Sequence, residues 1–169
     1  SGAAAQTIRT ERTDALSRKQ RAPGDTGLLA IVRLATWSKE KLTRLVDSRN
    51  RDLGEIRGMI ASIEASPPPA GASEAEFLKW SASISQLRSG LLKVQARYDE
   101  QIGRTWALMR IPLGVAAAAV NVGGGEPVPA MPVAIQNPGT LGLQLDWLDD
   151  LANAAIRPVD RKESEGQSI

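Results

Sequence analysis

Residues 38–41 (SKEK) have the spacing S-x-x-K, in which a serine hydroxyl can act as nucleophile and a lysine amine as its base. The motifs S-D-N and K-T-G, which complete such a site in penicillin-binding enzymes, do not occur in the sequence. The surrounding residues predict the middle of a long helix, where no pocket would enclose Ser38 and Lys41. We therefore interpret both side chains as part of a solvated helix face.

Two other patterns could bind or activate a substrate. The run 122–127 (VGGGEP) is rich in glycine, but a phosphate-binding loop needs a helix after it, and here prolines follow. The carboxylate pairs at 99–100 and 149–150 are sequential, so on a helix the two members of each pair do not face one another. We interpret the glycines as a flexible bend and the carboxylates as solvated faces.

Composition narrows the chemistry further. The chain has 169 residues and contains neither histidine nor cysteine. The usual zinc sites, thiol nucleophiles, disulfides and imidazole bases are thereby removed. We expect a protein that is not an enzyme, with no cofactor, no metal and no small-molecule substrate. The net charge of +2 is too small to imply a polyanionic partner by itself.

The two ends of the chain carry opposite charge. Residues 1–22 hold five basic and two acidic side chains, whereas residues 146–169 hold six acidic and three basic ones. Such ends could attract each other or dock neighbouring copies head to tail, although solvated tails are the simpler interpretation. No signal peptide is visible in residues 1–12, and no run reaches the roughly 20 apolar residues of a membrane span. The location stays open, between the cytoplasm and a virion or secretion assembly.

Hydrophobic periodicity predicts two long helices, which must position any functional side chain. In residues 26–64 the apolar side chains fall on one stripe, and the opposite face is charged. In residues 74–111 apolar side chains recur every seven residues from Phe77 and again from Trp80, over more than four heptads. The two helices are nearly equal, about 38 residues or 57 Å each at 1.5 Å per residue.

Local signals mark the ends of the second helix. Ser73 and Glu76 have the spacing of a capping box at its start. Pro112 is expected to end it, because a proline inside a helix removes a hydrogen bond and clashes with the preceding turn. Three prolines and a glycine in residues 65–73 (ASPPPAGAS) predict a tight tip between the two helices.

Equal helices around a short tip predict an antiparallel, coiled-coil-like hairpin over residues 26–111. Apolar residues meet along most of its length if paired residue numbers add to about 140. Arg49 is an exception that faces Leu91, and because a buried arginine is costly unless paired, we expect its side chain to reach towards solvent. The predicted hairpin core consists of Leu42, Val46, Leu53, Ile56, Ile60, Ile63, Phe77, Trp80, Ile84, Leu87, Leu91, Val94 and Tyr98.

The remaining segments complete a predicted all-α fold. Residues 1–25 form a polar, basic N-terminal segment. Residues 112–143 are apolar and rich in proline and glycine, which favours an extended strap lying on another surface. Residues 144–157 predict a short amphipathic helix that Pro158 ends, and residues 158–169 an acidic polar tail.

The predicted interaction surface combines two kinds of residue. Small side chains four residues apart on the first helix allow close helix approach. Apolar side chains concentrate at the open end of the hairpin, in the strap and in the last helix, where they could pack together or against a neighbouring subunit. These residues are Gly54, Gly58, Trp106, Met131, Trp147, Leu148 and Leu151.

These features favour a non-enzymatic structural or assembly component of a multi-protein complex. The composition, rich in arginine and alanine, favours a bacterial or phage source. We expect protein partners or self-association. One alternative is a secreted effector or adaptor that grips its target through the hairpin. Another is a nucleic-acid-associated accessory protein that uses the arginines of both helices, Arg33, Arg44, Arg51, Arg88, Arg97 and Arg104.

Overall fold

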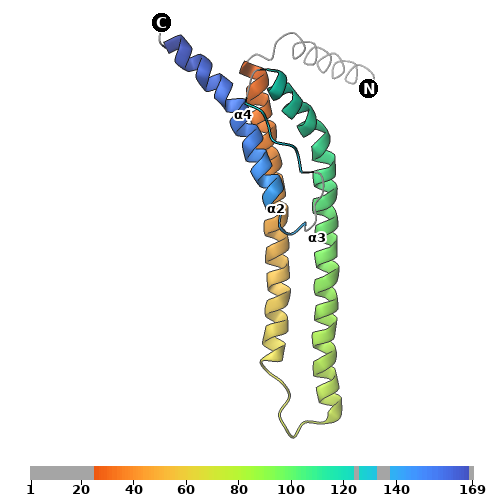
Figure 1. Ribbon diagram of the computed structural model, residues 1–169. Coiled ribbons are helices and arrows are strands. Elements are labelled where there is room, and N and C mark those ends of the chain that lie inside the picture. Colours follow the sequence, from red (N-terminus) through yellow and green to blue (C-terminus); the bar gives the residue numbers. More distant parts are fainter. Residues whose placement is uncertain (1–24, 124–125, 133–137, 168–169) are drawn as a thin grey trace, which may run out of the picture. The chain divides into compact units, whose positions relative to one another are not determined.

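The described part of the chain is all-helical. The computed structural model describes residues 25–123, 126–132 and 138–167, with side chains among these from 27 to 157. Three helices make up this part: α2 at Asp25–Glu64, α3 at Glu74–Val122 and α4 at Gly142–Gln167 (Figure 1). The helices α2 and α3 pack against each other, and the described residues contain no strand. The prediction of an all-α fold is confirmed at this level.

The start of α3 follows from its sequence. The Ser73 hydroxyl accepts a hydrogen bond from the backbone N–H of Glu76 at 3.3 Å. The Ser73 carbonyl also accepts from the N–H of Phe77 at 3.2 Å. The first of these bonds occupies an N–H group that has no partner within the helix, and the second is the first bond of the helix's own i to i−4 series. The predicted capping role of Ser73 is confirmed.

The end of α3 differs from the prediction. The helix passes through Pro112 and continues to Val122, so the expectation that Pro112 ends it is wrong. A proline in a helix interior costs about 3 kcal/mol or more. The segment after it recovers this cost because it contains a run of alanines, the best helix formers, and because Leu113, Ala116 and Val120 are buried.

The last helix is longer than predicted at both ends. It begins at Gly142 and reaches Gln167, so it neither stops at Pro158 nor leaves residues 158–167 as a non-helical tail. Good helix formers such as arginine, lysine and glutamate follow the proline in the sequence. The predicted strap is correspondingly shorter, and within it the described residues 126–132 are non-helical.

The described residues divide into two compact units, each with its own buried side chains. One unit, here called the three-helix unit, contains residues 25–39, 109–123, 126–132 and 142–167. The other, the two-helix unit, contains residues 40–108 and 138–141. The three-helix unit buries side chains from all three helices, among them Leu28, Ile31, Met109, Leu113, Trp147, Leu148 and Leu151. The two-helix unit buries Leu42, Leu53, Ile60, Ile84, Ile102 and Trp106.

The predicted hairpin core is only partly enclosed. Four of its thirteen residues are buried, namely Leu42, Leu53, Ile60 and Ile84. Phe77 is 38% exposed, and the other eight are half-buried. Two helices cover each other along one face only, so the residues at the edges of their contact remain open to solvent on both sides.

Candidate interaction site

A largely buried ion pair between Arg49 and Asp99 lies within the two-helix unit. The guanidinium Nε of Arg49 donates to Asp99 Oδ1 at 2.8 Å, and the two side chains are only 12% and 25% exposed. A Cβ placed on Gly139 would lie 2.6 Å from Nη1 of Arg49, so the backbone there packs directly on the guanidinium. The expectation that Arg49 reaches towards solvent is wrong, because Asp99 supplies the partner that a buried arginine needs.

A second polar contact lies in the same unit. The Tyr98 hydroxyl donates a hydrogen bond to Asp52 Oδ2. This hydrogen bond, together with partial burial and the negative charge of Asp52, raises the pKa of Tyr98 above its usual value of 10.0. Because Tyr98 is the only tyrosine in the chain, tyrosinate absorbance reports on this one contact.

Titration of Tyr98 in the folded protein is expected to have its midpoint above pH 10, and the Asp52→Ala variant is expected to move it back towards 10. The folded-state pKa is raised, so the stability that this contact contributes is fully present below pH 10. It is lost as the pH rises through the folded-state pKa. Absorbance near 295 nm, measured between about pH 8 and 12, checks the midpoint. Identical midpoints in both proteins would contradict the hydrogen bond.

Contacts also join the two helices next to the tip. The indole Nε1–H of Trp80 donates to the carbonyl oxygen of Ile63 at 2.7 Å. This carbonyl belongs to the last turn of α2, where backbone oxygens have no partner within the helix. Arg88 forms an exposed ion pair with Glu64 at 2.6 Å. The bond from Trp80 to the Ile63 carbonyl therefore caps the C-terminal end of α2. Hydrophobic periodicity alone does not reveal this role of Trp80.

In the three-helix unit, segment 126–132 is held by both neighbouring helices. The backbone N–H of Val128 donates to Asn121 Oδ1 of α3 at 3.0 Å. The indole Nε1–H of Trp147 on α4 donates to the carbonyl oxygen of Pro129 at 2.8 Å. A Cβ on Gly114 would lie 3.7 Å from the terminal methyl of Met131, an ordinary packing distance. These contacts fix an extended, proline-rich backbone that forms no helix of its own.

Removing the indole donor tests how segment 126–132 is held. The Trp147→Phe variant keeps an aromatic ring but leaves the Pro129 carbonyl without this donor. We expect the free energy of unfolding to fall by about 1–2 kcal/mol. Chemical denaturation checks this value. A free energy of unfolding equal to that of the wild type would show that the Trp147 bond contributes nothing to stability.

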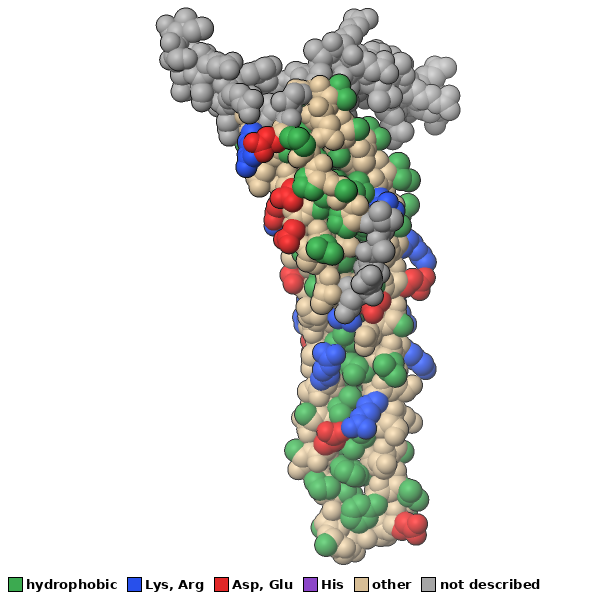
Figure 2. All heavy atoms as spheres, viewed as in Figure 1, with side chains coloured by type: hydrophobic (Ala, Val, Ile, Leu, Met, Phe, Trp, Pro, Cys, Tyr) green, Lys and Arg blue, Asp and Glu red, His purple; other side chains and the backbone are tan. Residues whose placement is uncertain are grey.

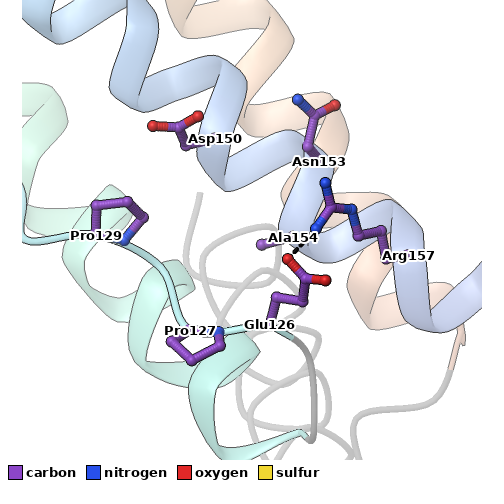
Figure 3. Close-up of a pocket in the computed structure, with 7 residues that line it drawn as sticks. All are labelled: Glu126, Pro127, Pro129, Asp150, Asn153, Ala154 and Arg157. Atoms are coloured by element: carbon purple, nitrogen blue, oxygen red, sulfur yellow. Dashed lines mark hydrogen bonds and ion pairs between the residues drawn. The ribbon is translucent and has the colours of Figure 1, made fainter.

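A shallow cavity of about 190 Å³ lies between segment 126–132 and α4. In Figure 3, Pro127 and Pro129 stand on one side, and α4 supplies the polar side chains on the other. An ion pair between Glu126 and Arg157 crosses the cavity. The lining residues are Glu126, Pro127, Pro129, Asp150, Asn153, Ala154 and Arg157.

The chemistry of this cavity is limited by its openness and by its ion pair. The Glu126 and Arg157 side chains are 46% and 55% exposed, so water reaches both of them. Their opposite charges neutralise each other. No side chain that lines this cavity is enclosed as a general acid or base in an active site would be. Among the described residues, no cluster of three or more acidic side chains could hold a metal ion.

The S-x-x-K pattern is positioned differently from the prediction. Ser38 is fully buried, and its hydroxyl oxygen has no hydrogen-bond partner among the described residues. Lys41 is exposed. The interpretation of both residues as one solvated face is therefore wrong for Ser38. Its small side chain fills a place in the apolar stripe of α2 between Ala35 and Leu42, which are both buried.

Most of the predicted interaction surface is internal. Trp106, Trp147, Leu148 and Leu151 are each at most 3% exposed, so they pack within the described part of the chain, which is one of the two arrangements that the sequence left open. Met131 is half-buried against α3. Gly54 and Gly58 alone remain as exposed members of this set, and apart from the adjoining turns of α2 no described atom lies within 4 Å of a Cβ placed on either.

Exposed apolar side chains instead occur at positions that the prediction assigned differently. Figure 2 shows hydrophobic side chains at the surface beside charged ones. On α3 six large hydrophobic side chains are 63–86% exposed, namely Leu78, Leu92, Leu108, Ile111, Val115 and Val122. One 18-residue window of α3 is long and apolar enough to cross a membrane by composition, and only 28% of it is buried. Of these positions, Val115 and Val122 lie in the segment that the sequence assigns to the strap, and the others lie in the predicted second helix.

Some of the arginines that could contact phosphates instead lie beside acidic side chains of the same chain. Arg88 pairs with Glu64, and Arg104 pairs with Glu100 at 2.6 Å. Arg51 lies 3.6 Å from a carboxylate oxygen of Asp52. Acidic partners beside these cations weaken the positive potential that attracts a nucleic acid backbone.

Comparison of the chain with protein-family models, with curated proteins and with solved structures finds no match. The structure defines an all-α protein whose first two helices pack together.

Proposed function

We propose that the protein is a non-enzymatic structural or assembly component of a bacterial or phage multi-protein complex. It acts through contacts that its helices and segment 126–132 make with neighbouring subunits. One observation carries this proposal: eleven large hydrophobic side chains among the described residues are more than about a third exposed, and they occur on all three helices. Large exposed apolar surface is typical of proteins that bind other proteins.

The proposed architecture is an antiparallel, coiled-coil-like hairpin of α2 and α3. Side-chain contacts support it, because Trp80 bonds to Ile63 whereas Asp99, later in α3, pairs with Arg49, earlier in α2. The numbers of the bonded residues add to 143 for Ile63 and Trp80 and to 148 for Arg49 and Asp99, both above the predicted sum of 140.

Low-salt affinity purification of the tagged full chain from its native cell or virion tests the proposed role. We expect the protein to sediment in a complex larger than its own mass of 18.0 kDa, with copartners identified by mass spectrometry. A triple variant, Leu78→Ser, Leu92→Ser and Leu143→Ser, is expected to release these copartners. Each of the three side chains is 63–72% exposed, so the fold itself loses little packing.

Two results would overturn the proposal. One is a compact, monodisperse monomer that co-purifies with nothing at low salt. The other is a complex whose composition is identical in the wild type and in the triple variant. The matched control is a triple variant in exposed polar residues on α2 and α3, Glu55→Ser, Arg57→Ser and Lys93→Ser, which is expected to retain the copartners.

A further inference from the structure

Segment 126–132 lies on the surface of the three-helix unit, yet it is bonded to a buried tryptophan. None of the residues in this segment is buried, and more than half of them are exposed. By contrast, the Trp147 side chain, whose indole N–H donates to the Pro129 carbonyl, is only 3% exposed. The segment therefore buries little apolar surface of its own, while its backbone occupies the hydrogen-bond donor of an aromatic ring on α4.

The polar contacts of this segment are individually weak. The Val128 N–H donates to Asn121 of α3, and Trp147 of α4 donates to a backbone carbonyl. The Glu126 and Arg157 side chains form an ion pair in which both are about half exposed. Neutral hydrogen bonds and exposed ion pairs each add little net stability. The cavity of about 190 Å³ between the segment and α4 adds unfilled space. Release of the segment is therefore easier than unfolding of the helices beneath it.

The chemistry of these contacts resembles the recognition of proline-rich peptides. Pro127 and Pro129 fix their own backbone angles, so the segment is extended before it binds. Domains that bind such peptides use grooves lined by aromatic side chains. Here Trp147 supplies the aromatic ring and a donor to a proline carbonyl, and Arg157 binds the carboxylate that precedes the first proline. Together with Asn121, these two residues form what is here called the Trp147 site.

The resident segment indicates which other ligand fits the Trp147 site. The same segment from a second copy of the chain gains no advantage over the tethered one, which is held at a high effective concentration. A segment of different sequence displaces it by adding contacts, and the cavity beside Asp150 and Asn153 leaves room for them. We propose that the Trp147 site binds an extended, proline-containing segment of a different subunit, with an acidic residue before its first proline. This inference rests on the proposed assembly role and names the chemistry of one partner.

Titration of a fluorescently labelled peptide, EPVPAMP, into the purified full chain tests the site. The peptide has the sequence of residues 126–132. The variant Pro127→Gly, Pro129→Gly weakens the resident segment, because glycine does not preset an extended backbone. Fluorescence anisotropy is expected to give a dissociation constant at least tenfold lower for this double variant than for the wild type, since its site is vacant in a larger fraction of molecules.

The matched control changes another pair of alternate prolines, Pro67→Gly and Pro69→Gly, both exposed at the tip between α2 and α3. This control is expected to bind the peptide as weakly as the wild type does. Circular dichroism verifies that all variants are folded.

An exchange of charges tests whether Arg157 recognises the acidic residue. In the double variant, a further Arg157→Glu change is expected to weaken binding of EPVPAMP by about fivefold and to favour the peptide KPVPAMP, whose lysine restores an ion pair. A further Trp147→Phe change is expected to weaken both peptides, because the proline carbonyl loses its donor. If Arg157→Glu changes the affinity for both peptides equally, Arg157 has only a structural role and the proposal is wrong.

The remaining outcomes are equally decisive. The absence of EPVPAMP binding to the double variant at millimolar peptide overturns the proposal. Equal affinities of the double variant and the wild type also overturn it, since the resident segment would then not compete. A wild-type dimer that Arg157→Glu dissociates would assign the site to a second copy instead of a different subunit. Because this test uses purified chain and synthetic peptide, its failure leaves the assembly role to the co-purification experiment, in which retained copartners would uphold that role without this site.

Discussion

Replacing Trp106 with alanine is expected to lower the free energy of unfolding by about 4 kcal/mol. The Trp106 side chain is 1% exposed and is the largest of the fully buried ones. Its removal combines the loss of a large apolar contact with a cavity that the surrounding helices cannot fully close. Urea denaturation followed by circular dichroism measures this change without relying on tryptophan fluorescence.

Trp37→Ala is the matched control, because the Trp37 side chain is 49% exposed. It is expected to cost about 1–2 kcal/mol, in proportion to the smaller area that it buries. The comparison also separates the structure from the sequence-based interpretation, in which Trp106 belonged to an interaction surface. If Trp106→Ala cost no more than Trp37→Ala, the buried position of Trp106 would be wrong.

The mistaken placement of Trp106 has a simple geometric cause. A strict seven-residue repeat counted from Phe77 and Trp80 reaches Gln101, Thr105 and Leu108. The structure instead buries the residues directly after these, Ile102, Trp106 and Met109. An ideal helix drifts by about 20° per heptad relative to a 3.5-residue repeat, and over four heptads this approaches the 100° that separates neighbouring residues. The helical pattern was thus predictable from the sequence, but its phase at the far end was not.

Local signals were more reliable than extrapolated ones. The cap at Ser73 depends on residues three apart, and the structure contains the expected bond. The effect of Pro112 depends on what the following ten residues contribute, and that contribution is the burial of Leu113, Ala116 and Val120 by tertiary packing. Helix propensities include the cost of the proline but not the stability gained by burying the residues after it. For this reason the sequence predicted an end of α3 that lies too early.

The partner of Arg49 illustrates the same limit for the candidate site. The sequence predicted that Arg49 falls on the apolar face of its helix and that burial there requires a partner. It did not identify Asp99, because the predicted pairing placed Leu91 opposite Arg49, whereas the ion pair joins Arg49 to Asp99, eight residues further along α3. Side-chain contacts across a helix pair depend on register, whereas the presence of the helices does not.

Asp99→Ala is expected to lower the free energy of unfolding by about 3 kcal/mol. The change leaves the Arg49 guanidinium, whose side chain is 12% exposed, without its carboxylate partner. The Glu100→Ala variant is the control on the neighbouring residue: the Arg104–Glu100 pair is 71% and 69% exposed, and its loss is expected to cost less than about 1 kcal/mol. Both values come from urea denaturation.

The double variant Arg49→Leu, Asp99→Leu separates the cost of an orphaned charge from the value of the pair. Replacing both members of a buried ion pair with apolar side chains removes two desolvation penalties along with one attraction, and the result is often neutral. We therefore expect the double variant to recover most of the stability that Asp99→Ala loses. If it is as unstable as Asp99→Ala, the pair itself stabilises the contact between α2 and α3. If Asp99→Ala and Glu100→Ala lose equal stability, the burial of the Arg49–Asp99 pair is wrong.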